Sequence, residues 1–212
     1  MQSDLNLKKD KTLTIVTTIL ASIIVAVCAV IIFFNLTHEY HVIKGSSMMP
    51  TLNNNSTDGV FVSTIKPYTR GDIIVYEKED GVHVIKRIIA MGGDKLKVEQ
   101  IDGQVRIVLI YAGEQEQTVL DEPYLENYEN NSILQTRFDK MIIDCALTLD
   151  ANGFFQLEEN QIFYLGDNRK VSNDCSIYGP KNKSGVVGKV DYIAYGNSFI
   201  YFQVLKQVFG GK

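Results

Sequence analysis

The sequence has few cysteines, with only three in 212 residues, and this is too few for a disulfide framework. Cys28 lies inside a hydrophobic run, so Cys145 and Cys175 are the two cysteines that could pair. The sequence also lacks the Cys-x-x-Cys and His-x-x-x-His spacings. Their absence argues against a structural or catalytic zinc site, and no metal or other cofactor is predicted.

The sequence also lacks an excess of basic residues. It has 21 Lys and Arg against 25 Asp and Glu, and its formal net charge is −4. An acidic chain without a basic stripe repels phosphate, so the composition predicts no nucleic-acid partner. The hydrophobic share of 45% and the charged share of 22% are typical of an ordinary globular protein.

Charged residues are absent from residues 12–37, and residues 13–34 are nearly continuous Ile, Val, Leu, Ala and Phe. An apolar run of about 20 residues is long enough to cross a bilayer as a helix. A cleaved signal peptide is one alternative, but bulky Phe33 and Phe34 occupy the place where small residues should mark the cleavage site. A buried core helix is the other alternative. The favoured interpretation is an uncleaved transmembrane anchor over residues 12–36, with the lipid bilayer as a partner.

The charges that flank this segment are asymmetric. Lys8, Lys9 and Lys11 precede it, and no Lys or Arg follows until Lys44. The positive-inside rule then predicts a cytoplasmic tail over residues 1–11 and an extracellular domain over residues 37–212. The expected location is the cell membrane, with a single pass.

Short apolar runs rich in Val, Ile, Tyr and Phe alternate with Gly, Asp and Asn turns throughout the rest of the chain. No internal repeat and no βαβ alternation is visible, so the predicted fold is mainly β, an antiparallel β-sheet ectodomain. The core is expected over about 38–95 and 160–205, with an inserted ribbon or variable region over about 96–159. The expected strands cover residues 60–62, 73–76, 82–89, 95–100, 105–111, 141–149, 154–157, 162–165, 186–195 and 199–205. The last run has an alternative interpretation as surface that touches lipid.

The stretch GSSMMPTL at residues 45–52 places Ser47 between a glycine and a proline, shortly after the membrane segment. On its own, this composition is typical of a plain turn. It gains interest from the strand over residues 82–89, where Val84, Lys86 and Ile88 share one face. The lysine can cover apolar surface with its stem while its ammonium group reaches water. Alternatively, burial lowers its pKa, and a neutral lysine can accept the proton of a serine hydroxyl.

A second polar stretch follows the expected strand at 162–165. It contains GDNR at residues 166–169, then Ser172 and Asp174. Clustered Gly, Asp, Asn and Ser after a strand usually form only a turn. A functional loop would instead place the Ser172 hydroxyl against the lysine amine, and Asp167 would be a candidate partner for Arg87.

These stretches together resemble the bacterial type I signal peptidases, peptidase family S26, in the Gram-positive form with a single anchor. The resemblance rests on GSSMMPTL at 45–52, RGDIIV at 70–75, KRII followed by GD at 86–94, and the polar stretch at 166–174; DEPYL at 121–125 also fits. It implies a serine endopeptidase with a Ser-Lys dyad that cleaves N-terminal signal peptides from secreted preproteins after small residues.

The resemblance also implies residue roles. Ser47 would be the nucleophile and Lys86 the general base, with Ser172, Asp174, Arg87 and Asp167 in support. The Ser47 N–H would help to hold the oxyanion. The substrate would lie as an added β-strand, and its pocket would draw on Gly45, Met48, Leu52, Val84 and Ile85.

The sequence departs from the family pattern at two places. Gly92 stands where the family has proline, and Cys175 and Ser176 stand where it has Ser-Arg. The missing arginine removes a partner of Asp174. This departure motivates a second interpretation, a signal-peptidase-like factor of weak or no activity that assists assembly of surface or pilus proteins, with pilin subunits as partners. A third interpretation is a sortase-like transpeptidase with Cys175 as nucleophile, although no arginine follows Arg169.

Overall fold

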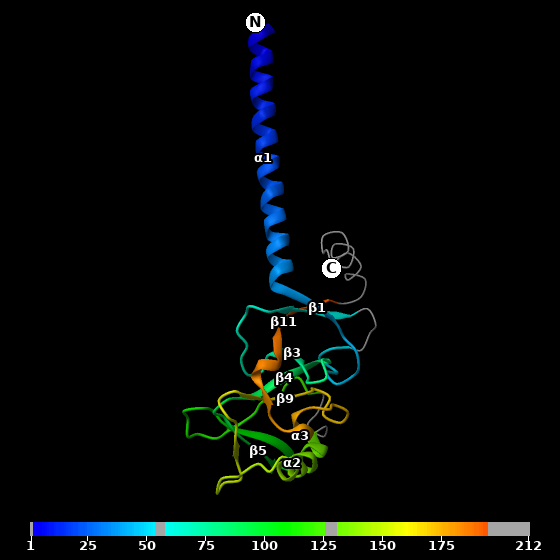
Figure 1. The fold of residues 1–212 in the computed structure, drawn as a ribbon, viewed down its shortest axis with the longest axis vertical. Helices are drawn as coiled ribbons and strands as arrows, with labels where there is room; N and C mark the ends of the chain where they lie inside the picture. Colours follow the sequence, from blue (N-terminus) through cyan, green and yellow to red (C-terminus); the bar gives the residue numbers. More distant parts are fainter. Residues whose placement is uncertain (1, 54–57, 126–130, 195–212) are drawn as a thin grey trace. The chain divides into compact units, whose positions relative to one another are not determined.

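The computed structural model describes residues 2–53, 58–125 and 131–194. The chain divides into two compact units, Met1–Glu39 and Tyr40–Lys212, and each is described by itself. The element order is shown in Figure 1.

The first unit is built on helix α1 (Gln2–Thr37). Within it, Lys11–Thr37 forms a stretch of 27 residues with a mean hydropathy of 3.0. No Gly or Pro interrupts residues 12–37, so nothing in the local sequence breaks the helix. By length and composition this helix can cross a membrane.

The second unit contains a seven-stranded sheet in the order β1-β2-β11-β3-β4-β9-β10. Every neighbour pair whose register is described is antiparallel. The prediction of a mainly antiparallel β domain that follows one N-terminal apolar helix is therefore confirmed. The strands are β1 (His38–Val42), β2 (Gly59–Ser63), β3 (Ile73–Glu77), β4 (His83–Met91), β9 (Gln161–Leu165), β10 (Lys181–Asn182) and β11 (Val186–Ala194).

A second sheet of four strands, in the order β7-β6-β5-β8, is formed by residues between β4 and β9. Its longest pairing joins β5 and β6 across a tight turn at Asp102 and Gly103, both of which have positive φ. Two helices and one short 3-10 helix complete the described part of this unit. These elements are β5 (Lys95–Ile101), β6 (Gln104–Ile110), β7 (Thr118–Val119), β8 (Phe155–Gln156), α2 (Ser132–Asp144), α3 (Cys175–Tyr178) and η2 (Lys183–Gly185).

The expected strand over residues 141–149 is wrong. Residues 132–144 form α2, whose buried side chains are Leu134, Phe138 and Met141. Their spacing of four and three residues follows the helical period, so one face of α2 packs into the core. Only Leu149 makes a β contact, an isolated bridge to Phe155. The expected strand over residues 199–205 lies outside the described residues.

Side chains of β3 and β4 alternate between two apolar clusters. Ile74, Tyr76 and Ile88 belong to the larger cluster, which also contains residues of the second sheet and of α2. Val75 belongs to a smaller cluster, and Ile85 packs against it. The smaller cluster includes Met48 and Leu52 of the serine turn. Alternation along the strands therefore directs Val75 and Ile85 toward the apolar side chains of the serine turn.

Candidate active site

The serine turn, residues 45–52, is anchored by its apolar side chains. Met48 is 3% exposed and Leu52 is fully buried in the smaller cluster. The turn is closed by a hydrogen bond from the Leu52 N–H to the Met48 carbonyl oxygen, 2.9 Å. Gly45 has a φ of 85°, a conformation that side chains disfavour. Between these anchors, Ser47 is left half-buried beside β4.

Lys86 lies in β4 and is 3% exposed. Its Nζ donates hydrogen bonds to the Ser47 Oγ and to the Ile85 carbonyl oxygen, each at 2.8 Å. Burial lowers the pKa of Lys86 below its ordinary value of 10.5, and the carboxylates of Asp174 and Asp167 oppose this shift. We consider burial decisive, because no carboxylate forms an ion pair with Nζ among the described residues. The pair therefore combines a hydroxyl with an amine that loses its proton more readily than a free lysine.

Arg87, the next residue, points to the other side of β4. Its Nε and Nη2 bind the two Asp167 carboxylate oxygens at 2.9 and 2.6 Å. The Thr51 hydroxyl donates to the same carboxylate at 2.5 Å. The Tyr124 ring centroid lies 3.9 Å from the Arg87 Cζ, a cation–π distance. Asp167 thus ties the polar loop to both β4 and the serine turn.

The polar loop, residues 166–176, comes close to the Ser47 backbone. The Asn168 N–H donates to the Ser47 carbonyl oxygen at 3.0 Å. A Cβ at Gly166 would lie 2.4 Å from this same oxygen and 2.2 Å from the Ser172 Oγ. Only glycine therefore fits where the loop crosses the serine turn.

Ser172 is fully buried, and its Oγ has no hydrogen-bond partner among the residues that the structure describes. The expected hydrogen bond from Ser172 to Lys86 is thus not present, and the role of Ser172 in orienting the lysine stays a prediction. Asp174 accepts hydrogen bonds from the Gly166 N–H at 2.9 Å and the Ser176 hydroxyl at 2.7 Å. Ser176, which stands in place of the family's arginine, therefore still holds one oxygen of Asp174.

Arg137 of α2 holds the polar loop from outside, a role that no sequence pattern indicated. Its guanidinium donates to the carbonyl oxygens of Arg169 and Lys170, each at 3.0 Å, and of Ser172 at 2.8 Å. Backbone carbonyls leave no residue-specific pattern in a sequence, so no signal could have found this contact.

A buried ion pair also fixes the polar loop. The Arg169 guanidinium, 1% exposed, forms an ion pair with the Glu122 carboxylate, which is fully buried. Arg169 also donates to the Asn131 side-chain oxygen and to the Gly166 carbonyl oxygen, both at 3.0 Å. The Tyr124 hydroxyl donates to Glu122 at 2.8 Å. The sequence signal for this contact was the DEPYL stretch at 121–125. Its Glu122 neutralises the buried Arg169 cation beside the site.

A comparable link joins two other stretches of the family pattern. Arg70 binds both oxygens of the buried Asp94 carboxylate, at 2.6 and 2.5 Å.

Between Lys86 and Asp94, Gly92 replaces the family's proline. A Cβ at Gly92 would lie 2.3 Å from the Glu159 carbonyl oxygen, so the close approach of that backbone explains the glycine here.

The cysteines are free. Cys145 is exposed and Cys175 is buried, so the possible pairing of these two is not formed. The Cys175 sulfur accepts a hydrogen bond from the Tyr164 N–H at 3.3 Å. Burial raises the pKa of the Cys175 thiol far above its ordinary value, which disfavours the thiolate that a sortase-like reaction needs.

A cavity of about 160 Å³ adjoins the Ser47–Lys86 pair. It brings together all five residues expected to bind substrate, and Val42, Ile43, Lys44 and His83 complete its wall. These five residues are Gly45, Met48, Leu52, Val84 and Ile85. The described residues contain no group of three or more His, Cys, Asp or Glu side chains that could hold a metal ion.

The chain is similar to several known proteins. The chain is 32% identical over 179 residues to signal peptidase I S of Bacillus subtilis strain 168, covering 82% of this chain and 86% of that protein. It is 31% identical over 170 residues to signal peptidase I of Bacillus caldolyticus, covering 79% and 85%. A crystal structure of a signal peptidase I from Enterococcus faecalis V583 has 28% identity and a TM-score of 0.40, covering 60% of this chain and 99% of that one.

The family match extends over most of the chain. The family described as signal peptidase, peptidase S26, matches residues 15–195, a range that includes much of α1 and the whole site. Family membership and the apolar helix together indicate a membrane-anchored peptidase that acts on signal peptides. The chain therefore belongs to the signal peptidase family, peptidase S26.

Proposed function

We propose that this protein is a membrane-anchored serine endopeptidase that cleaves N-terminal signal peptides from secreted preproteins with Ser47 as nucleophile and Lys86 as general base. The observation that carries the proposal is the 2.8 Å distance between the Lys86 Nζ and the Ser47 Oγ, because the lysine is buried and the serine borders a cavity. This is the contact that a nucleophile and its base require.

The reaction follows from these two groups. Neutral Lys86 takes the Ser47 hydroxyl proton while the Oγ attacks the scissile carbonyl carbon. The protonated lysine then gives its proton to the leaving amine as the peptide C–N bond breaks. Water attacks the resulting ester, Lys86 again acts as the base, and the free serine returns. The Ser47 N–H is the proposed backbone donor to the oxyanion.

The open edge of β4 supports the proposed mode of substrate binding. The described pairing of β9 with β4 begins at Arg87 and continues toward Met91. Residues 83–86 of β4 therefore have a neighbour strand only on the β3 side within this register. An extended peptide can add as a strand at this edge, with its scissile bond beside Ser47.

The size of the cavity supports cleavage after small residues. The cavity, of about 160 Å³, would have to hold every side chain that an added strand points toward Ser47. Met48 and Leu52 close its floor and are held by the smaller apolar cluster. A tightly packed apolar floor does not yield, so it accepts small side chains and excludes large ones.

The orientation in the membrane is part of the proposal. Lys8, Lys9 and Lys11 precede the span, which places the N-terminus in the cytoplasm and the catalytic domain outside the cell. Substrates tethered in the same bilayer by their own signal peptides would then reach the enzyme from the membrane. The described residues provide no observation that favours the pilus-assembly factor.

The test is cleavage of a purified preprotein by the full-length chain in detergent micelles. We expect Ser47→Ala and Lys86→Ala each to lower kcat/KM by at least about 10³-fold. The matched controls are Ser46→Ala, the neighbouring hydroxyl, and Lys183→Ala, an exposed lysine outside the lining of the cavity. Equal processing by wild type and Ser47→Ala would overturn the protease proposal, and the product ends read by mass spectrometry would identify the cleaved bond.

A further inference from the structure

We propose that His41 and His83 form a binding site for a divalent transition-metal ion such as Zn²⁺ or Cu²⁺, and that the bound ion hinders peptide binding at the neighbouring edge of β4. The metal site rests on the geometry around the two histidines. The inhibition rests on the proposed function, because it needs a peptide at that edge.

The two histidines come from strands that are not neighbours in the sheet. His41 lies in β1 and His83 in β4, and β2, β11 and β3 stand between them in the strand order. The two rings nevertheless lie close together, with their centroids 5.0 Å apart. The two residues are 42 positions apart in the chain, so no spacing motif in the sequence marks the pair.

The ring nitrogens of this pair converge as the ligands of a metal ion do. The two Nδ1 atoms are 3.4 Å apart, closer than the ring centroids, so the Nδ1 edges of the rings point toward each other. Tetrahedral coordination at about 2.0–2.1 Å places two ligand nitrogens about 3.4 Å apart. A hydrogen bond from an N–H group is usually shorter, about 2.7–3.2 Å. The separation therefore fits two nitrogens that share a metal ion better than two that share a proton.

A carboxylate faces the other ring nitrogen of His83. Glu77 pairs with His83 across β3 and β4, and its Oε2 lies 3.9 Å from the His83 Nε2. A carboxylate on this side favours the tautomer whose Nε2 carries the proton, which leaves the Nδ1 lone pair for the metal. Histidines that bind metals in proteins commonly have such a carboxylate partner.

A cavity of about 330 Å³ borders both rings and leaves room for water ligands. Since the described residues contain no group of three or more His, Cys, Asp or Glu ligands, water would complete the coordination. A structural zinc site has four protein ligands and a catalytic one has three, so an ion held by two would exchange readily. Lys44 also borders this cavity, but its side chain is exposed and its ammonium group reaches water. The lining residues are Tyr40, His41, Val42, Lys44, Val75, His83 and Ile85.

The metal site adjoins the place proposed for the substrate. His83 lines both this cavity and the one at Ser47, and it begins the stretch of β4 that the described pairing with β9 does not reach. An ion held by His41 and His83 would tie β1 to this stretch. A peptide that adds as a strand there would have to displace the ion, so the bound ion should raise the KM for the peptide.

Calorimetric titration of the full-length chain in detergent micelles, without a polyhistidine tag, tests the site. We expect one Zn²⁺ ion per chain, tighter binding of Cu²⁺, and no binding of Mg²⁺, which prefers oxygen ligands. His41→Ala and His83→Ala should each weaken Zn²⁺ binding at least about 100-fold, because each removes one of two protein ligands. His38→Ala removes the third histidine of the chain and should leave the affinity unchanged. Equal affinity in wild type, His41→Ala and His83→Ala would overturn the site.

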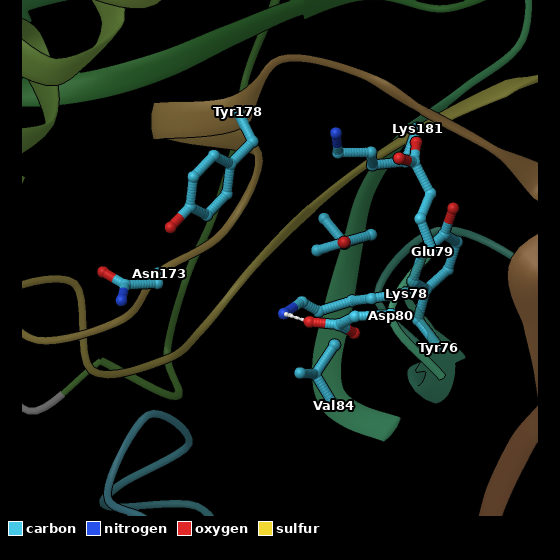
Figure 2. Close-up of a pocket in the computed structure, with 9 residues that line it drawn as sticks. Tyr76, Lys78, Glu79, Asp80, Val84, Asn173, Tyr178 and Lys181 are labelled. Atoms are coloured by element: carbon cyan, nitrogen blue, oxygen red, sulfur yellow. Dashed lines mark hydrogen bonds and ion pairs between the residues drawn. The ribbon is translucent and has the colours of Figure 1, made fainter. Parts of the chain in front are cut away.

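A pair of carboxylate variants tests the partner of His83. Glu77→Gln should weaken Zn²⁺ binding about tenfold, because it removes the charge that orients the ring. Glu79→Gln is the matched control, since Glu79 lines a separate cavity of about 350 Å³ (Figure 2). Equal affinities in the two variants would overturn the role of Glu77.

Two further measurements do not depend on titration heats. Electron paramagnetic resonance of bound Cu²⁺ should show coupling to two imidazole nitrogens in wild type and to one in His41→Ala. Zn²⁺ should raise the Tm of wild type and of His38→Ala but not of His41→Ala, and the unfolding curve without metal shows that each variant is folded. The same Cu²⁺ spectrum in wild type and His41→Ala would contradict the pair.

Cleavage of a preprotein with and without Zn²⁺ tests the inhibition. Saturating Zn²⁺ should raise KM at least about tenfold in wild type and in His38→Ala, with kcat little changed. In His41→Ala the KM values with and without Zn²⁺ should be nearly equal. Zn²⁺ bound by both histidines without a change in KM would overturn the inhibition and support the site. A chain that cleaves no preprotein without Zn²⁺ would overturn the proposed function, whereas the binding measurements would still decide the site.

Discussion

The serine turn and the polar loop meet at the same place but are held by different forces. Met48 and Leu52 anchor the turn through apolar burial. The loop is held by charged and polar groups, above all Arg137 and the buried Glu122–Arg169 pair. The nucleophile is therefore positioned by apolar packing, whereas the loop that crosses it is positioned by charged and polar contacts.

The largest expected effect concerns the buried ion pair of the loop. Glu122→Ala leaves the Arg169 guanidinium buried without a charge partner, which should lower the free energy of unfolding by about 3–5 kcal/mol. Denaturant unfolding of the detergent-solubilised chain measures this change. The double variant Glu122→Leu/Arg169→Met removes both charges and should recover much of the loss. A Glu122→Ala protein as stable as wild type would contradict the view that charge holds the loop.

The serine turn offers the apolar counterpart. Leu52→Ala removes a fully buried side chain from the smaller cluster and should cost about 2–5 kcal/mol of unfolding free energy. The same denaturant measurement applies. Repeating it at several salt concentrations sharpens the contrast with the charged polar loop. We expect the loss in Leu52→Ala to be insensitive to salt, since no charge is involved. Ile65→Ala, an exposed side chain, is the control for a substitution without burial. A cost similar to that control would contradict packing as the anchor of the turn.

The pH dependence of kcat/KM tests the electrostatic environment of Lys86, to which the serine turn and the polar loop both contribute. Only the neutral amine can act as base, and burial lowers the pKa of Lys86. We therefore expect kcat/KM to rise with pH, up to about tenfold per unit, and to level off at an apparent pKa below 10.5. Asp174 raises the pKa of Lys86, so Asp174→Asn should move the profile to lower pH. Activity that is flat from weakly acidic to alkaline pH would rule out the lysine base.

The smallest expected effect is that of Arg137. Arg137→Ala removes three hydrogen bonds to loop carbonyls without touching the substrate cavity. We expect kcat to fall about tenfold with KM nearly unchanged, because about 1.4 kcal/mol of positioning is lost at the reacting atoms. Arg137→Lys should recover part of the rate. Lys140→Ala, an exposed cation on the same helix, is the matched control. Equal losses in kcat for Arg137→Ala and Lys140→Ala would show that the clamp has no positioning role.

Much of the fold could be predicted from local patterns. The apolar runs over residues 73–76, 82–89, 95–100 and 105–111 were expected to be strands, and the structure contains β3, β4, β5 and β6 at these places. Helix α2 was missed because the buried residues Leu134, Phe138 and Met141 are separated by polar ones, and the apolar end of the helix resembles a strand. In that region the sequence fits both a helical and a strand period, and packing against the second sheet favours the helix.

The site divides in the same way. By itself, the sequence determined an apolar segment long enough to span a membrane, a serine in a turn, and a lysine on an apolar strand, because period and composition act over a few residues. Only the tertiary structure decided that Lys86 contacts Ser47, that Ser176 binds Asp174 while Arg137 binds carbonyl oxygens of the loop, and that a cavity adjoins Ser47. Hydrogen bonds and cavities depend on distances between atoms far apart in the chain, and only the folded chain sets those distances.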